Sequence, residues 1–151
     1  MIIALAQLNY KIADLEGNRT KIIDSINNAK KKGADLVIFS EMSVCGYPPQ
    51  DLLEQQDFIN DVEKSIDFIK KHCIGIAAII GAPVINDRKK GKKLFNTAIF
   101  IDNGKIIHRQ FKTHLPTYDI FDEYRYFEQN THFELIEFKG KRIALTICED
   151  L

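Results

Sequence analysis

Leu36-Val37-Ile38-Phe39-Ser40-Glu41 is the stretch that decides the fold. Its four apolar residues, placed after Gly33, predict a short buried strand that ends at a hydroxyl and a carboxylate. Residues 2–7 form an earlier apolar run. Between the two runs, apolar residues recur at helical spacing, at Ile22, Ile23, Ile26 and Ala29. The order strand, helix, strand predicts a β-α-β unit and therefore an α/β protein.

The alternation continues and then gives way to hairpins. Apolar residues at helical spacing over residues 59–69 predict a second helix, and residues 74–84 predict a second buried strand. The dipeptide Asn103-Gly104 accepts positive φ and favours a tight hairpin turn, and Lys139-Gly140 marks a second turn. The strands expected around these turns are residues 94–101, 105–111, 133–138 and 141–148. We therefore expect an α/β fold with a mixed sheet and helices on one face.

The composition argues against several classes of partner. Lys plus Arg and Asp plus Glu each number 21, so no overall charge draws the chain toward nucleic acid or an anionic membrane. Five cations within residues 88–93 predict a solvated loop. No apolar run approaches the roughly 20 residues that span a bilayer, and the start lacks the pattern of a secretion signal. We expect a cytoplasmic protein that binds neither nucleic acid nor membrane.

The three cysteines, Cys45, Cys73 and Cys148, are odd in number and widely scattered, with no Cys-x-x-Cys pair. This pattern fits neither a disulfide framework nor a zinc site, so we expect no metal. A functional cysteine in this chain would act as a thiol.

Three reactive side chains stand at or just beyond the end of an expected strand: Glu41, Lys112 and Cys148. In α/β architectures the strand ends of one sheet line the usual ligand crevice. A thiolate attacks an amide carbon, and a neighbouring ammonium lowers the thiol pKa and faces the oxyanion that forms. A carboxylate can receive the thiol proton and return it to the departing nitrogen. The backbone N–H of Glu149 would supply a second donor to the oxyanion.

Each of these residues also has an ordinary explanation when it is taken alone. Cys148 could be an inert buried thiol. Glu41 could be a cap or a surface carboxylate, and Lys112 could be a solvated lysine. The catalytic interpretation depends on the three residues occurring together.

The segments around these residues resemble the three signature blocks of the nitrilase superfamily. They are Phe39-Ser40-Glu41, Lys112 ahead of Leu115-Pro116, and Ile147-Cys148-Glu149-Asp150. The resemblance implies the N-terminal part of an α-β-β-α sandwich with a Glu-Lys-Cys triad. It implies that Glu41 is the general base, Lys112 the transition-state stabiliser and Cys148 the nucleophile that forms a thioester.

Longer stretches are similar to one branch of this superfamily, the glutaminase domain of glutamine-dependent NAD synthetases. The stretches are residues 46–53, 115–127 and 147–151. The similarity implies glutamine as substrate, with Tyr118 and Glu149 in the substrate-binding part of the site. It also implies that Glu123 stands beside the lysine and holds it. Tyr118 could instead be a packing aromatic, and Glu123 an exposed loop carboxylate.

The same resemblance implies that residues 1–151 are the N-terminal portion of a glutaminase domain and that a synthetase domain is missing. No Ser-Gly-Gly loop for ATP occurs in the chain. ATP, Mg²⁺ and deamido-NAD would therefore bind in the missing domain, and we expect no cofactor in this one. In the full-length parent, ammonia from glutamine would serve the ATP-dependent conversion of deamido-NAD to NAD.

A sheet that stops soon after Cys148 would expose an edge and apolar surface. We therefore expect the chain to pair with another copy as a homo-oligomer, or with the missing remainder, and to hydrolyse glutamine poorly by itself. Two other functions remain open from the sequence. One is a different nitrilase-type amidase, and the other is a silent fragment that acts only as an interaction or oligomerisation unit.

Overall fold

A computed structural model describes residues 1–88 and 90–151 of the chain. It begins with a β-α-β unit, as the sequence predicts. Strand β1 (Ile3–Ala6) and strand β2 (Leu36–Phe39) lie parallel, and helix α1 (Leu15–Lys31) connects them. Helix α1 begins where the Asp14 side chain accepts a hydrogen bond from the Gly17 backbone N–H at 3.0 Å.

The second α/β unit differs in detail from the expectation. Helix α2 (Gln56–Lys70) precedes strand β3 (Ala77–Ile85), which pairs with β2 in parallel. The expected strand over residues 74–84 therefore begins later and runs through Pro83. Pro83 is tolerated because the pairing of β3 with β2 ends at Ile79, so the missing N–H of Pro83 breaks no bond to β2.

Both expected hairpins are present. Strands β4 (Leu94–Asp102) and β5 (Lys105–Phe111) are antiparallel, and Asn103 and Gly104 take φ values of 46° and 73° in the turn. Strands β6 (Leu135–Phe138) and β7 (Lys141–Ala144) form a separate two-stranded sheet. Short helical turns also occur at η1 (Gln50–Glu54), α3 (Glu123–Tyr126) and η2 (Cys148–Asp150).

Two features of the second hairpin correct the sequence interpretation. The strand expected over residues 141–148 ends at Ala144, although Leu145 and Ile147 remain buried. Alternating apolar residues appear in a sequence whether or not their backbone pairs with a neighbouring strand. The expected strand was therefore too long. Cys148 therefore does not stand at the end of a strand in the same sheet as Glu41 and Lys112.

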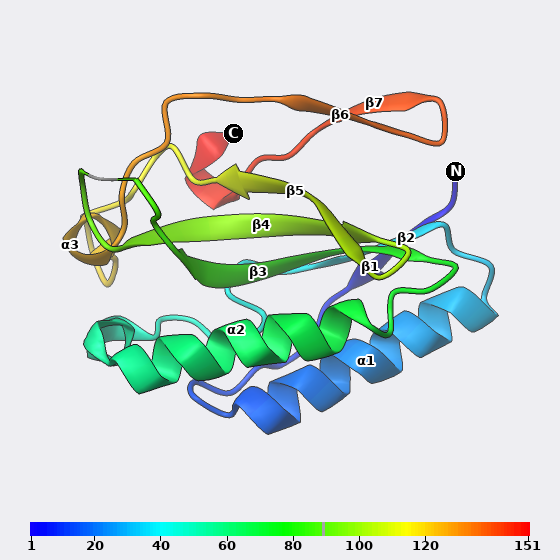
Figure 1. Ribbon diagram of the computed structural model, residues 1–151, viewed down its shortest axis with the longest axis horizontal. Helices are drawn as coiled ribbons and strands as arrows, with labels where there is room; N and C mark the ends of the chain where they lie inside the picture. Colours follow the sequence, from blue (N-terminus) through cyan, green and yellow to red (C-terminus); the bar gives the residue numbers. More distant parts are fainter. Residues whose placement is uncertain (89) are drawn as a thin grey trace.

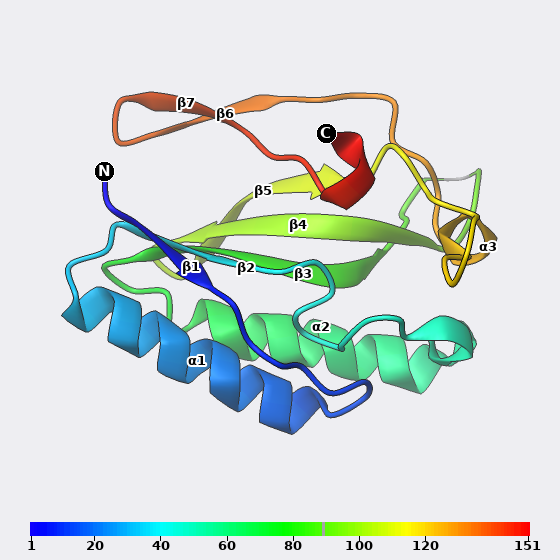
Figure 2. The same ribbon diagram turned by 180° about the vertical axis from the view of Figure 1, so that it is seen from behind.

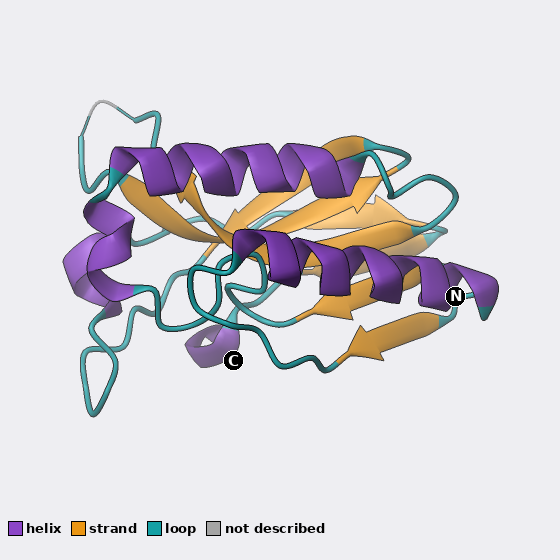
Figure 3. Ribbon diagram, turned by 90° about the horizontal axis from the view of Figure 1, so that it is seen from below, coloured by secondary structure: helices purple, strands orange, loops and turns teal. Residues whose placement is uncertain are grey.

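The elements form three layers (Figure 1). The five-stranded sheet, in the order β1-β2-β3-β4-β5, has both long helices on one face and the β6–β7 hairpin on the other (Figure 2). Viewed from the helical side, α1 and α2 lie side by side across the strands (Figure 3). One apolar core lies between helices and sheet, and a smaller one joins the sheet to the hairpin. The expected mixed sheet with helices on one face is confirmed.

No helix among residues 1–88 and 90–151 is long and apolar enough to cross a membrane. Lys89, within the basic run of residues 88–93, lies outside the described residues, so the structure does not test the expected loop there. The three cysteines are free thiols; Cys45 and Cys73 are buried, whereas Cys148 is exposed.

Candidate active site

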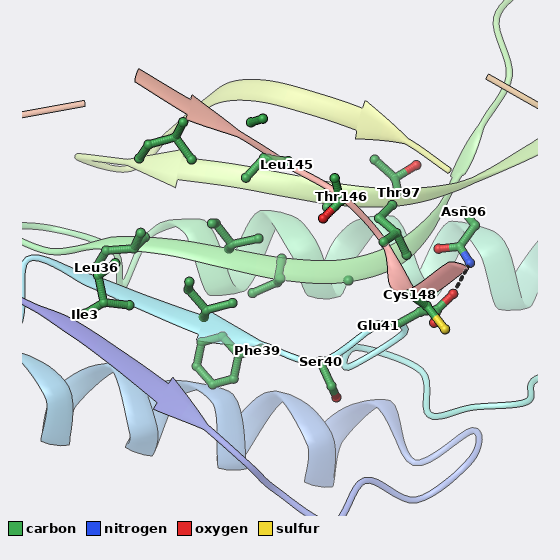
Figure 4. A pocket seen from close by; sticks show the side chains of 18 of the residues that line it. Ile3, Leu36, Phe39, Ser40, Glu41, Asn96, Thr97, Leu145, Thr146 and Cys148 are labelled. Carbon is green, nitrogen blue, oxygen red and sulfur yellow. Dashed lines mark hydrogen bonds between the residues drawn. The ribbon is translucent and has the colours of Figure 1, made fainter. Parts of the chain in front are cut away.

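Three chain segments meet at one end of the sheet. Glu41 lies two residues beyond β2, Lys112 lies directly beyond β5, and Cys148 begins the turn η2. Glu41 and Cys148 line one pocket of about 320 Å³ between the sheet and the segment that follows β7. Figure 4 shows the Cys148 sulfur beside the Glu41 carboxylate. The structure thus gathers the three predicted catalytic residues although they come from two different sheets.

Lys112 is the centre of a buried ionic cluster. Its Nζ donates a hydrogen bond to Glu41 Oε1 at 2.8 Å and another to Glu123 Oε1 at 2.9 Å. Lys112 is 1% exposed and Glu123 is 4% exposed. Neither residue is therefore the solvated side chain that its type alone would suggest, and Glu123 holds the lysine.

Burial and pairing act against each other in this cluster. Burial lowers the pKa of Lys112, but the hydrogen bonds and charges of Glu41 and Glu123 outweigh burial, so the pKa is raised and the side chain is an ammonium. Burial raises the pKa of Glu123, and the hydrogen bonds from Lys112 and Tyr47 oppose that rise without cancelling it. Lys112 therefore remains charged at neutral pH, whereas the effect of burial appears as the raised pKa of Glu123.

Cys148 sits in a strained turn. Its φ of 48° lies in the left-handed region, which a residue other than glycine adopts at a cost of about 1–3 kcal/mol. Burial and the charge of Glu41 raise the pKa of the thiol, whereas Lys112 and the Glu149 backbone N–H lower it by less. The net lowering of the thiol pKa that was expected from the ammonium is therefore not found.

The other expected substrate-binding residues lie beside the thiol. The Tyr118 hydroxyl donates a hydrogen bond to Glu149 Oε2 at 3.0 Å, and Tyr118 is 55% exposed. Its ring contacts Phe121 edge-on, with centroids 5.6 Å apart. Tyr118 and Glu149 form an exposed polar pair next to Cys148, whereas Glu123 is buried in the Lys112 cluster.

Three further residues support the site, and the sequence interpretation missed all of them. Asn96 donates from Nδ2 to Glu41 Oε1 at 2.6 Å and to Glu123 Oε2 at 3.2 Å. The Tyr47 hydroxyl donates to Glu123 Oε1 at 2.9 Å. Asp150 accepts backbone hydrogen bonds from the two residues that follow Lys112 and from the residue that precedes Cys148. The only available signals were a polar residue inside the apolar run of residues 94–101 and the Gly-Tyr-Pro-Pro and Cys-Glu-Asp stretches.

These groups can support attack on a carbonyl carbon, because a thiol and a carboxylate line one pocket and a fixed ammonium is bonded to that carboxylate. An α/β fold with that set at one end of its sheet is compatible with a hydrolase. The chain belongs to the carbon-nitrogen hydrolase family, whose family model matches residues 2–151.

Within this family, the chain is similar to the glutamine-dependent NAD(+) synthetases of several bacteria. The glutamine-dependent NAD(+) synthetase of Synechocystis sp. is 40% identical over 153 residues, and that of Aquifex aeolicus is 36% identical over 151 residues. Each match covers 99% of this chain but only 27% and 26% of the respective relative. The chain thus spans about a quarter of the length of these relatives.

Solved structures agree with this assignment. The glutamine-dependent NAD+ synthetase of Acinetobacter baumannii, in complex with ADP, matches with a TM-score of 0.89 and 34% identity over 98% of this chain and 27% of that one. An amidase of the nitrilase superfamily from Nesterenkonia, at 22% identity, matches with a TM-score of 0.82 over 98% of this chain and 55% of its own. The second likeness confirms the nitrilase-type fold.

Proposed function

We propose that this chain carries the glutaminase site of a glutamine-dependent NAD synthetase. The observation that carries the proposal is the buried cluster in which Lys112 bonds both Glu41 and Glu123 beside the thiol of Cys148. The identity of 40% to a curated NAD(+) synthetase across 99% of the chain supports glutamine as the amide. The reaction converts glutamine and water to glutamate and ammonia.

The first chemical step is acylation of the thiol. Cys148 Sγ attacks the amide carbon of glutamine as Glu41 takes the thiol proton. The raised pKa of the Cys148 thiol makes such a base necessary. Glu41 then gives the proton to the amide nitrogen, the C–N bond breaks, and ammonia leaves a γ-glutamyl thioester on Cys148.

Lys112 and the Glu149 backbone stabilise the oxyanion. An ammonium has three N–H donors, and among the described residues two of those of Lys112 are used by Glu41 and Glu123. The Lys112 side chain is fully buried, and its third donor would turn toward the carbonyl oxygen as that oxygen gains charge. Water, deprotonated by Glu41, then attacks the thioester and releases glutamate with the thiol restored.

We further propose that residues 1–151 are the N-terminal portion of the glutaminase domain and that ammonia passes to a synthetase domain of the parent protein. ATP, Mg²⁺ and deamido-NAD would bind in that domain. Among the described residues no group of three His, Cys, Asp or Glu side chains is placed to hold a metal ion.

A diazoketone analogue of glutamine tests the proposal without requiring fast turnover. The purified protein is treated with the glutamine analogue and with the analogue one methylene shorter, and the adducts are located by mass spectrometry. We expect faster labelling by the glutamine analogue, on Cys148, with protection by glutamine and no labelling of Cys148→Ser. Equal rates for both analogues would point to a different amidase, and absence of labelling would favour a silent interaction unit.

The role in NAD synthesis needs the full-length parent. Ammonia release from glutamine should depend on Cys148 and should rise when ATP and deamido-NAD are added. A rate of ammonia release that is unchanged by ATP and deamido-NAD would contradict the coupling to a synthetase. It would leave only the amidase activity.

A further inference from the structure

Asn96 makes contacts that packing alone does not require. It lies within strand β4, is 1% exposed, and directs its amide nitrogen at both carboxylates of the cluster. One N–H reaches Glu41 Oε1 at 2.6 Å, and the other reaches Glu123 Oε2 at 3.2 Å. A single neutral amide therefore bridges the two acids that flank Lys112.

The orientation of this amide follows from its surroundings. A turned amide would place Oδ1 against two carboxylate oxygens, and the oxygens would repel it. In the observed orientation Asn96 Oδ1 is buried and has no hydrogen-bond partner among the described residues. A buried polar atom without a partner destabilises a fold, so Asn96 is a poor choice for packing alone and a good one for holding two acids.

The contacts treat the two oxygens of Glu41 differently. Oε1 accepts from Lys112 at 2.8 Å and from Asn96 at 2.6 Å. No hydrogen bond from the described residues reaches Oε2. Figure 4 shows the bond from Asn96 on one side of the Glu41 carboxylate and the Cys148 sulfur close by. One oxygen is thus anchored, and the other remains available.

We propose that Asn96 is a positioning residue that anchors Glu41 through Oε1, so that Oε2 is the oxygen that exchanges the proton with Cys148. This inference rests on the proposed function for its meaning, because proton exchange matters only where the thiol acts as a nucleophile. Asn96 also separates Glu41 from Glu123 by giving each its own N–H. Lys112 cannot both anchor Glu41 and separate it from Glu123 by itself, because its single positive charge is shared between the two carboxylates.

The test measures the rate of Cys148 alkylation by iodoacetamide between pH 6 and 10, with the modified peptide identified by mass spectrometry. The charged and titratable groups that face the Cys148 thiol are Glu41, Lys112, Glu123, Tyr47 and Tyr118, together with Glu149, which Tyr118 hydrogen bonds. Asn96→Leu removes both donors at similar volume. The net charge is unchanged, but Glu41 and Glu123 each lose an N–H whose positive end offset their charge at the thiol, so the midpoint should rise by about half a pH unit or more. Asn96→Asp keeps the shape and adds a negative charge, so its midpoint should rise further, by about one unit.

The alkylation profile of Asn96→Leu separates positioning from packing, because Asn96→Asp raises the midpoint by its charge in either case. A purely structural role predicts a lower thermal midpoint of unfolding and an unshifted profile for Asn96→Leu, whereas the positioning role predicts a shifted profile. Asn18→Ala is the matched control, since Asn18 is also fully buried and donates only to the backbone oxygens of Lys11 and Val44. It should lower the thermal midpoint of unfolding without shifting the alkylation profile. Asn96→Ser, which retains one donor, replaces Asn96→Leu if the latter fails to fold.

An unshifted alkylation profile in folded Asn96→Leu or its replacement Asn96→Ser, or a shift of equal size in Asn18→Ala, would overturn the inference. The outcome does not depend on turnover. If the protein fails to discriminate between the glutamine analogues, the proposed function fails, yet the alkylation midpoints still report whether Asn96 controls the environment of Cys148.

Discussion

Asp150 is hydrogen bonded to Thr113, the residue that follows Lys112, although 37 residues separate them in the chain: the Thr113 backbone N–H reaches Asp150 Oδ1 at 2.9 Å. The same oxygen accepts the His114 backbone N–H at 2.8 Å, and Oδ2 accepts the Ile147 backbone N–H at 3.2 Å. One carboxylate therefore ties the turn that carries the thiol to the segment that carries the ammonium.

Replacing Asp150 should loosen that tie. Asp150→Ala removes three acceptor contacts, each worth about 1 kcal/mol, so we expect a stability loss of about 1–3 kcal/mol and at least a tenfold slower labelling of Cys148 by the glutamine analogue. Asp150→Asn keeps Oδ1 and should be intermediate. Asp24→Ala, on the exposed face of α1, is the control and should change neither quantity. Unchanged labelling of the Asp150→Ala protein would show that the turn η2 keeps Cys148 in position without the Asp150 hydrogen bonds.

Gly81 should prove essential for the position of Glu41. A Cβ at Gly81 would lie 2.5 Å from Met42 N and 2.7 Å from Ser40 O, the backbone atoms on either side of Glu41. Gly81→Ala must therefore displace that segment, with a loss of about 1–3 kcal/mol in stability and of most labelling by the glutamine analogue. Gly140→Ala adds its Cβ to open space at a φ of 70° and should cost stability alone. Equal labelling by the two variants would refute this reading.

The three thiols should differ in reactivity. Burial raises the pKa of Cys45 and of Cys73 to about 12 in each case, whereas Cys148 is exposed. At pH 8, brief treatment with iodoacetamide should therefore modify Cys148 first, and Cys45 and Cys73 only after unfolding. Peptide mass spectrometry after partial reaction measures the order. Cys148→Ser is the control, which should leave the native protein almost unlabelled. Simultaneous modification of all three would contradict an accessible active thiol.

Expected strand ends made Glu41, Lys112 and Cys148 candidates in the sequence, and the family resemblance added to that choice; the structure brings the three segments together, although the strand before Cys148 ends at Ala144. Each follows a segment that was expected to form a strand. A polar side chain just beyond such a segment does not contribute to the apolar core that the segment helps to form. Which sheet a strand joins was not visible, because alternation carries no information about its partner. The segment before Cys148 was for that reason assigned to the wrong sheet, while the pocket still formed where the two layers meet.

The supporting residues escaped because their function depends on partners distant in sequence. Asn96 occupies one position in a buried strand, and only the fold shows that two carboxylates converge on it from 55 and 27 residues away. Asp150 acts on backbone N–H groups, which every residue but proline presents, so no residue pattern marks them. The type of a reactive side chain can be read from the sequence. The groups that position it are recognised only from their contacts in the folded structure.

Removal of the Lys112 charge should give a protein whose stability depends on pH in a defined direction. Lys112→Met leaves Glu41 and Glu123 facing one another without a cation, and breaking a buried pair costs about 3–5 kcal/mol. Burial already raises the pKa of Glu123, and the loss of Lys112 raises it further. An acid whose folded-state pKa exceeds its unfolded value of about 4.3 favours the folded state below that value. The variant should therefore lose stability as pH rises through the folded-state pKa.

In the wild type the contribution of Lys112 should stay constant over this range, because its raised pKa keeps that contribution complete below the unfolded value of about 10.4, and only a rise through the folded-state pKa removes it. The raised pKa of Glu123 should therefore give the wild type a smaller loss of stability with rising pH than the variant shows. Urea unfolding at pH 5 and pH 8 distinguishes the two: the deficit of Lys112→Met should be smaller at pH 5. Adding Glu123→Gln should recover much of the loss at pH 8, since it removes one of the facing charges. Lys64→Met, which breaks an exposed pair with Asp61, should leave both midpoints nearly unchanged. A deficit of equal size at both pH values would mean that Lys112 supports the fold by packing and not by its charge.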